Sequence, residues 1–160
     1  MTFVATANPP TTAAEPVLSN DGWFPDLNPI ELRAACKLDG SVTTERFKPA
    51  LQDAMLNVNT ELQAWADEQR SRWGYACLAD VPAPQVGGES AKVLYYRRAV
   101  MACLQADLLD TYRGMGTLGT GKTIDRDKDD LQLNAADYRR NQRWAISDLL
   151  GRARTTIDLL

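Results

Sequence analysis

The feature of the sequence that most constrains the fold is an apolar stripe between residues 47 and 65. Large apolar side chains recur there at steps of three and four positions: Phe47, Leu51, Met55, Val58, Leu62 and Trp65. Such steps follow the 3.6-residue repeat of an α-helix, so these side chains share one face. The stripe predicts a long helix that begins at Thr43 or Thr44 and ends at Gly74. Pro49 is tolerated only near the first turn, so we expect the start of this helix to be kinked or tightened.

A short helix is predicted before the long one, over residues 29–38. Asn28 is a good N-cap, Pro29 suits the first helical position, and Gly40 can close the helix in a left-handed conformation. After the long helix, residues 75–88 contain two prolines and two glycines, which indicates a loop.

Two more helices are predicted in the second half of the chain. Residues 89–113 are apolar over more than one face, which is typical of a central helix. Residues 130–150 carry a further apolar stripe, which predicts a helix that ends at Gly151. Residues 114–129 connect this helix to the one before it. Because no convincing strand with alternating polarity precedes the tail, the sequence predicts an all-α fold, a small up-and-down bundle of about four helices.

The composition along the chain divides it into three parts. Residues 1–22 are rich in Ala, Thr and Pro and are expected to form a flexible N-terminal arm. Residues 23–152 form the helical bundle, and residues 153–160 form a flexible C-terminal tail without a helix cap. The N-terminus does not read as a secretory signal, and no apolar stretch approaches the ~20 residues of a membrane span. We therefore expect no membrane contact and a location in the cytoplasm.

The residue types argue against an enzyme or a metal protein. The 160 residues include no histidine, the commonest general base and metal ligand, and the formal net charge is only -3. The cysteines, Cys36, Cys77 and Cys103, are too widely spaced for a disulfide framework or a zinc site, so Cys36 and Cys103 are predicted to be buried thiols. Asp107 and Asp110 share a helical face, which we interpret as solvated. We predict no catalytic, cofactor-binding or metal-binding residues.

A nucleotide-binding alternative rests on residues 116–123, GTLGTGKT, which satisfy the P-loop pattern G-x-x-x-x-G-K-[ST]. A P-loop needs a buried strand before it, whereas the preceding residues read as the end of a helix. The following acidic cluster, Asp125, Asp127, Asp129 and Asp130, would repel a polyphosphate. We favour an inter-helix loop, with Gly114 and Gly116 ending one helix and the aspartates favouring the start of the next.

Basic residues gather in two places. Tyr95, Tyr96, Arg97 and Arg98 are consecutive, which favours core tyrosine with surface arginine over a nucleic-acid face. Five arginines lie near the C-terminus of the chain: Arg139, Arg140, Arg143, Arg152 and Arg154. They either complement the negative end of the last helix or face DNA or an acidic partner.

Several segments together resemble the head completion, or head stabilisation, proteins of temperate myophages, the GPL family. The resemblance lies in their order and spacing and covers about residues 23–152, whereas the first twenty residues, the loop from 116 to 129 and the tail depart from the family. The segments that carry it are 23–29 (WFPDLNP), 78–82 (LADVP), 88–90 (GES), 92–100 (KVLYYRRAV), 112–114 (YRG), 143–145 (RWA) and Gly151.

The resemblance implies a viral structural protein without enzymatic activity or cofactor. Such a protein completes and stabilises the DNA-filled head, as a connector ring below the portal onto which the tail docks. The implied partners are the portal protein, a tail terminator or tail completion protein, copies of itself in a ring of twelve, and the packaged double-stranded DNA in the channel. The implied location is the virion, after assembly in the host cytoplasm.

The contacts to neighbours or portal are expected in apolar segments with little local structure. We assign them to Trp23 and Phe24 and, in the tail, to Ile157, Leu159 and Leu160. For the two aromatic residues a role as a staple onto the core is the favoured alternative, because large aromatic side chains are usually buried. The competing hypotheses for the whole chain are the P-loop protein described above and a helical interaction module of an unrelated pathway.

Overall fold

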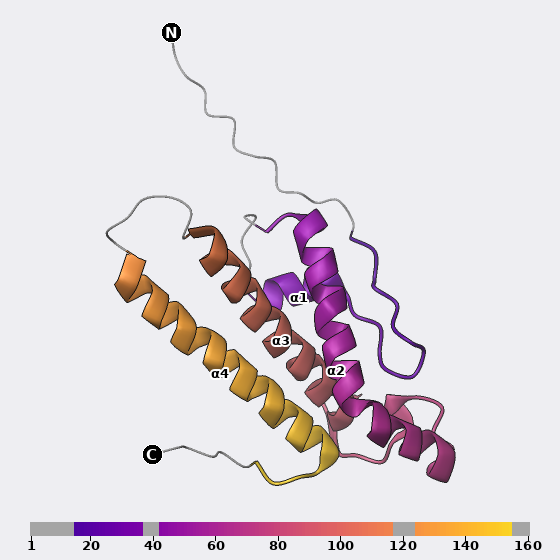
Figure 1. Ribbon diagram of the computed structural model, residues 1–160. Helices are drawn as coiled ribbons and strands as arrows, with labels where there is room; N and C mark the ends of the chain where they lie inside the picture. Colours follow the sequence, from indigo (N-terminus) through magenta and orange to yellow (C-terminus); the bar gives the residue numbers. More distant parts are fainter. Residues whose placement is uncertain (1–14, 37–41, 117–123, 155–160) are drawn as a thin grey trace.

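The described part of the chain is almost entirely helical. A computed structural model describes residues 15–36, 42–116 and 124–154, without the side chains of 112–116 and 124–134. The all-α prediction is confirmed. The elements, in chain order, are the helices α1 (Pro29–Ala35) and α2 (Thr44–Trp73), the 3-10 turn η1 (Leu78–Asp80), the strands β1 (Gln85–Val86) and β2 (Glu89–Ser90), and the helices α3 (Ala91–Gly116) and α4 (Ile124–Leu150) (Figure 1).

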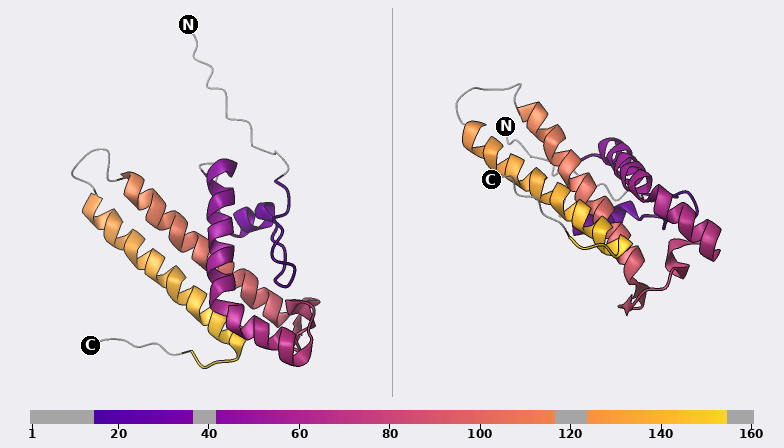
Figure 2. Two further views of the ribbon diagram at one scale, coloured as in Figure 1. Left: turned by 45° about the vertical axis from the view of Figure 1, so that its right-hand side comes forward. Right: turned by 60° about the horizontal axis from the view of Figure 1, so that its bottom comes forward.

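The helices are arranged around α3. α3 and α4 run antiparallel and side by side along their length, and α2 packs on another side of α3 (Figure 1). Figure 2 shows that α2 changes direction in its second half and that α2 and the α3–α4 pair diverge at one end. α1 lies across α3, where Leu32 and Ala35 line a hollow together with Met101. The prediction that the third helix is packed on several sides is therefore confirmed.

The predicted stripe of α2 forms one wall of the core. Its members from Phe47 to Leu62 are buried, and Trp65 is partly buried against them. The facing side chains come mainly from α3 and include Val93, Tyr96, Val100 and Leu104, and α4 adds Ala145, Ile146 and Leu149. Gly74 ends α2 at a φ of 71°, as predicted for a left-handed C-cap.

Three helix ends differ from the prediction. α1 stops at Ala35, three residues early, and Gly40 lies outside the described residues. α3 continues through Gly114 to Gly116, and α4 begins at Ile124 rather than at residue 130. Packing of α3 against α4 outweighs the roughly 1 kcal/mol that a glycine costs inside a helix. By sequence, Asp125 and Asp127 fall in the first turn of α4 and not in the connector before it; negative charge at this end interacts favourably with the helix dipole.

The loop between α2 and α3 contains a small hairpin that the sequence analysis missed. β1 and β2 are antiparallel and pair Gln85 with Ser90 and Val86 with Glu89. Gly87 and Gly88 have φ values of 60° and 83°, and two successive positive φ angles are the requirement of a type I′ turn. The adjacent glycines were a signal for a hairpin, but strands of two residues have no alternating pattern to detect.

The ordered body begins before residue 23. The backbone of Leu18 forms two hydrogen bonds with Leu27, of 2.8 and 3.0 Å, and the Leu18 side chain is only 8% exposed. Residues 15–22, predicted as part of a flexible arm, therefore pack on the bundle, because a single buried leucine and a backbone bridge anchor them. Residues 1–14 and 155–160 lie outside the described residues, so the predicted arms stay predictions.

Candidate interaction surface

The two aromatic residues predicted to contact partners lie in the core instead. Trp23 is 3% exposed and Phe24 is 2% exposed. Their rings meet edge to face at a centroid distance of 4.9 Å, and Phe24 stacks on Tyr96 at 5.0 Å. The Trp23 indole Nε1 donates to the Tyr75 carbonyl at 3.2 Å. The assignment of these residues as exposed contacts is thus corrected, and the favoured alternative of a staple onto the core is confirmed, because both rings are enclosed by α2, α3 and the loop after α2.

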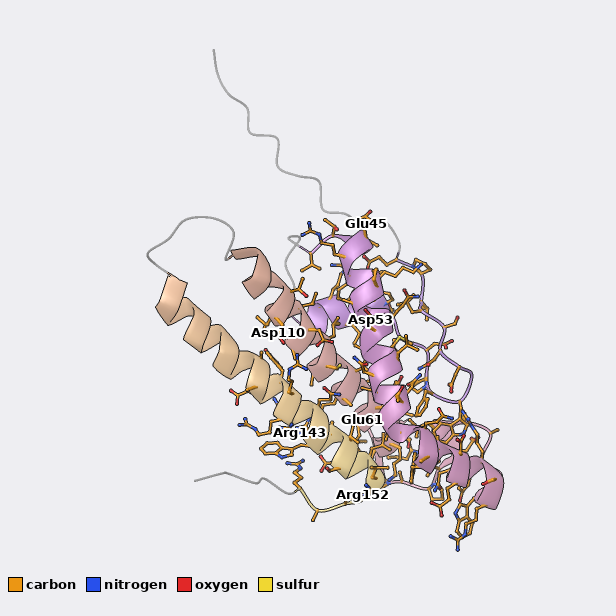
Figure 3. All side chains as sticks on the ribbon, viewed as in Figure 1. Glu45, Asp53, Glu61, Asp110, Arg143 and Arg152 are labelled. Carbon is orange, nitrogen blue, oxygen red and sulfur yellow. The ribbon has the colours of Figure 1, made fainter. Side chains whose placement is uncertain are left out.

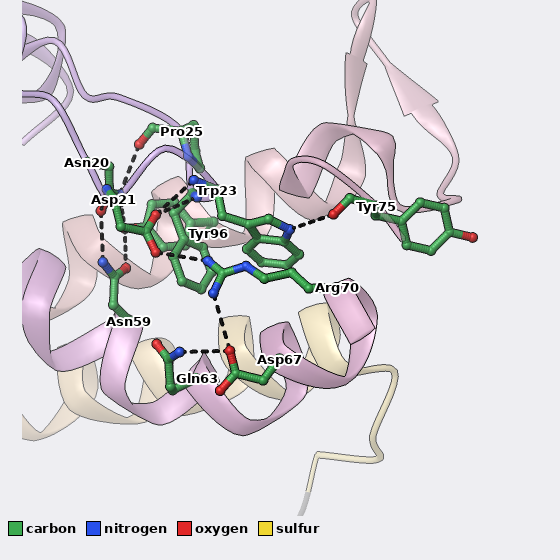
Figure 4. A network of polar contacts seen from close by, with 11 residues as sticks. Asn20, Asp21, Trp23, Pro25, Asn59, Gln63, Asp67, Arg70, Tyr75 and Tyr96 are labelled. Atoms are coloured by element: carbon green, nitrogen blue, oxygen red, sulfur yellow. Dashed lines mark hydrogen bonds and ion pairs between the residues drawn. The ribbon is translucent and has the colours of Figure 1, made fainter. Parts of the chain in front are cut away.

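A polar network holds the residues before Trp23 in place (Figure 4). The Asn20 Nδ2 amide donates to the Tyr96 hydroxyl at 2.8 Å, and this hydroxyl donates to Asn59 Oδ1 at 2.7 Å. The Asn59 amide then donates to Asn20 Oδ1 at 2.8 Å, which closes a ring of three residues from three segments. Burial raises the pKa of Tyr96, so the hydroxyl stays protonated and can donate.

The same network continues along α2 through charged groups. Asp21 accepts hydrogen bonds from the backbone N–H groups of Trp23 and Phe24, at 3.0 and 2.9 Å. Arg70 of α2 donates to Asp21 at 3.1 Å, and its guanidinium lies 5.1 Å from the Trp23 ring centroid. Trp23 and Phe24, which we call the aromatic staple, are therefore held through the backbone N–H groups of both residues and through the ring face of Trp23.

Arg33 holds Glu15 beside the start of α2. It forms a bidentate pair with Glu15, with distances of 2.8 and 2.9 Å, and donates to the Val42 carbonyl at 2.7 Å. Its guanidinium lies 4.1 Å from the Phe47 ring centroid. Thr44 adds a hydrogen bond of 2.6 Å to Glu15. The hydrogen bonds from Arg33 hold the pKa of Glu15 below its usual value. Residue 15 is thus tied to the start of α2.

The end of the described chain turns back along α4. Gly151 has a φ of 70°, and the Arg152 N–H donates to the Ser147 carbonyl at 2.9 Å, the long bond of a Schellman motif. After this turn, Arg154 forms a bidentate pair with Asp148, at 2.9 and 2.5 Å. Its guanidinium lies 5.3 Å from the Trp144 ring centroid. Residues beyond 154 therefore start beside the outer side of α4.

Trp144 is the centre of a group of basic side chains. Arg140 lies 4.9 Å from the Trp144 ring centroid and pairs with Asp137 at 2.9 Å. Arg98 of α3 lies 3.7 Å from Asp148. Arg143 and Arg152 are exposed and form no ion pair with the described residues (Figure 3). We call five residues the arginine face: Arg98, Arg140 and Arg154, which contact Trp144 or Asp148, and the exposed Arg143 and Arg152, which are close to Arg140 and Arg154 in the sequence.

Lys92, and not the arginine cluster, caps the C-terminal end of α4. Its ammonium group donates to the Leu149 carbonyl and lies 5.5 Å from the Trp65 ring centroid. Desolvation lowers the pKa of Lys92. The contact joins α2, α3 and α4 at one point. Sequence reasoning missed it because a single lysine in a helix carries no signal of its partners.

The other half of the α3–α4 pair is acidic. Asp107 and Asp110 of α3 share a face, as predicted, and both bind Arg139, at 3.5 and 2.5 Å. Asp107 also lines a hollow of about 390 Å³ between α2 and α3, with Asp53 and Leu56 among its other walls. The first half of α4 contains four aspartates by sequence. Charge is therefore segregated along the pair, and Arg139 marks the boundary.

The structural setting does not suit a P-loop. The residues before the motif belong to α3, which runs to Gly116, and α4 begins at Ile124. A helix thus stands where a P-loop requires a strand. Lys122 and the rest of residues 117–123 lie outside the described residues, as do the predicted contact residues Ile157, Leu159 and Leu160.

Other kinds of site were sought among the described residues. No group of three or more His, Cys, Asp or Glu side chains is placed there to hold a metal ion. None of the helices combines the length and apolar character that crossing a membrane requires, as far as the chain is described. Cys36 and Cys103 are buried, as predicted, and Cys77 is partly exposed. Tyr96 is a core tyrosine, and Arg97 pairs with Glu89 at 2.8 Å.

Comparison with known proteins agrees with the resemblance noted in the sequence. A family model described as "Phage head completion protein (GPL)" matches residues 18–160. The head completion/stabilization protein of Escherichia phage P2 is 35% identical over 149 residues, which cover 93% of this chain and 86% of the relative. No solved structure matches the chain. The chain belongs to the phage head completion protein (GPL) family.

Proposed function

We propose that this protein completes and stabilises the DNA-filled phage head by forming a ring below the portal, onto which the tail docks. Membership of the family supports the coarser part of this proposal, a structural role in head assembly and a place in the virion. The finer part is supported by where the described chain begins and ends.

The described chain begins and ends at opposite ends of the bundle. Glu15 is bonded beside the start of α2, whereas Arg154 lies beside the last turns of α4 (Figure 1). α2 has 30 residues and so rises by about 45 Å. The segments before residue 15 and after residue 154 therefore start far apart, which suits a connector that contacts two different layers.

The proposed partners come from the family resemblance, and this arrangement is compatible with them. The segment after residue 154, with Ile157, Leu159 and Leu160, contacts the portal, and the opposite end of the bundle faces a tail terminator or tail completion protein. Copies associate side by side, twelve to a ring, and the packaged double-stranded DNA passes through the centre. Assembly takes place in the host cytoplasm. Ring closure is a heterologous contact, so two different faces of the bundle must fit each other.

Electron microscopy of this protein mixed with the portal protein of the same genome tests the proposal. We expect a ring of density stacked on the portal with matching symmetry. Deletion of residues 155–160 should remove this ring but leave helicity unchanged, since Arg154 and its contacts are retained. Deletion of residues 1–14, at the other end, is the matched control and should leave the ring in place.

Two results would contradict the proposal at different levels. A ring that persists without residues 155–160 would show that the tail segment is not the portal contact. Bare portals, both with purified portal protein and with portals in DNA-filled heads, would show that the protein does not form the connector ring.

A further inference from the structure

The arginine face differs in charge from the protein as a whole. The face contains five arginines and only two aspartates that pair with them, Asp137 and Asp148. It is therefore positively charged, although the whole chain has a formal net charge of -3. Arg143 and Arg152 are exposed, without an ion pair to the described residues. Burial raises the pKa of Glu61 of α2, and the nearby charge of Arg143 opposes this rise only in part; the two residues form no ion pair.

Three of the five cations of this face, those of Arg98, Arg140 and Arg154, are held by contacts with Trp144 or with aspartates. Arg140 and Arg154 both lie over Trp144, and Arg154 and Arg98 share Asp148. The hydrogen bonds from Arg154 lower the pKa of Asp148, so the carboxylate that organises the face stays ionised at neutral pH. Side chains that are already ordered lose less entropy when they bind a ligand.

The face has few means of binding a protein by apolar contact. Protein interfaces usually centre on an exposed aromatic or apolar anchor. The large apolar side chains that are exposed in the described residues are Val17, Ile30, Leu56, Trp73 and Val86, and they belong to other surfaces. Trp144 is partly buried beneath two guanidinium groups. A face of four exposed arginines and the partly buried Arg140 suits a polyanion, which is bound through its phosphates by charge.

We propose that the arginine face binds the phosphate backbone of double-stranded DNA without sequence preference. Its biological setting, contact with the packaged DNA, depends on the proposed connector function, but the binding itself does not. Contacts to phosphates hold DNA without reading its sequence, and each one releases counterions, so the affinity must fall as salt rises.

Fluorescence anisotropy with two labelled duplexes of unrelated sequence tests this inference on the whole purified chain. We expect similar affinity for both duplexes and a steep loss between about 50 and 200 mM salt. The double variant Arg143→Glu/Arg152→Glu should bind at least about tenfold more weakly. It should also reduce the slope of log K against log salt by about two, one for each lost phosphate contact.

A matched control separates this face from a general effect of charge. Arg46→Glu/Arg72→Glu makes the same change in net charge at exposed positions of α2 and should lower affinity by less than about threefold. The milder Arg143→Gln/Arg152→Gln should give an intermediate loss, and circular dichroism should show unchanged helicity in every variant.

Two outcomes would overturn the inference. One is the absence of any anisotropy change with the wild-type chain at the lowest salt, and the other is an equal loss in the test and control pairs. If DNA binding is absent and Arg143→Glu/Arg152→Glu abolishes the ring on the portal, the face binds an acidic protein surface instead. An intact ring with this variant would leave the connector proposal standing, whatever the DNA result.

Discussion

The Asn20 amide lies 2.8 Å from the Tyr96 hydroxyl, although 76 positions separate the two residues in the sequence. Through Asn59, this hydrogen bond ties the segment before the aromatic staple to both α2 and α3. Tyr96 is fully buried and the bond itself is partly buried, so an unpaired polar group there is costly. The network therefore specifies one position for the N-terminal segment on the bundle.

Loss of the Tyr96 hydroxyl should destabilise the protein. In Tyr96→Phe, Asn59 Oδ1 loses its donor, and we expect the free energy of unfolding to fall by about 1–3 kcal/mol in urea titrations. Tyr95→Phe is the matched control, because the hydroxyl of this partly buried residue has no hydrogen bond to the described residues. An equal loss in both variants would show that the network contributes nothing specific.

The Glu15–Arg33 pair should make stability depend on pH. Because the pKa of Glu15 is lowered on folding, the pair stabilises above the unfolded value of 4.5 and its contribution is lost as pH falls through the lower folded value. Glu15→Gln should thus be less stable than wild type in urea at pH 7, and the difference should shrink toward pH 3. Glu68→Gln, at an exposed pair with Arg72, should show little difference at either pH. A constant difference at all pH values would refute an ionic origin.

Two tryptophans that differ greatly in exposure allow the stability cost of a substitution in the core to be compared with that of one at the surface. Trp23→Ala removes a side chain that is 3% exposed and should cost about 3–5 kcal/mol. Trp73→Ala removes one that is 58% exposed and should cost within about 0.5 kcal/mol. Thermal or urea unfolding measures both. A small cost for Trp23→Ala would restore this residue as a candidate for the partner interface.

The three thiols should differ in reactivity. Burial raises the pKa of both Cys36 and Cys103 to about 11, so little thiolate forms at pH 8 and access is blocked as well. We expect the reagent DTNB to modify one thiol rapidly in the folded protein and all three in denaturant. Cys77→Ser should abolish the rapid phase. A second rapid thiol in wild type would mean that a buried cysteine becomes exposed by local unfolding.

Periodic features of the sequence were sufficient to predict the main helices. The stripe from Phe47 to Trp65 and the closing Gly74 marked α2 almost to the residue, because a single face and a left-handed cap are both local signals. The ends of α3 and α4 were missed, since each helix is extended there by packing on the other rather than by its own composition.

The details of the surface depended on contacts that no local pattern reveals. Leu18 follows another apolar residue, Val17, and nothing in the sequence shows which of the two is buried; in the structure Leu18 is buried beside Leu27 and Val17 is exposed. The sequence around Trp23 and Phe24 gives no indication that Tyr75 and Tyr96 are their neighbours in the fold. The arginines near the C-terminus were visible in the sequence, but their arrangement around Trp144 and Asp148 required the fold.

The segregation of charge along α3 and α4 has a consequence for any assembly of aligned copies. Copies placed side by side in one orientation bring their arginine faces to one rim and the half that contains Asp107 and Asp110 to the other. Such an assembly has an electrical polarity, with two rims of opposite sign. A charged partner approaching such an assembly would therefore meet a different charge on each of its two sides.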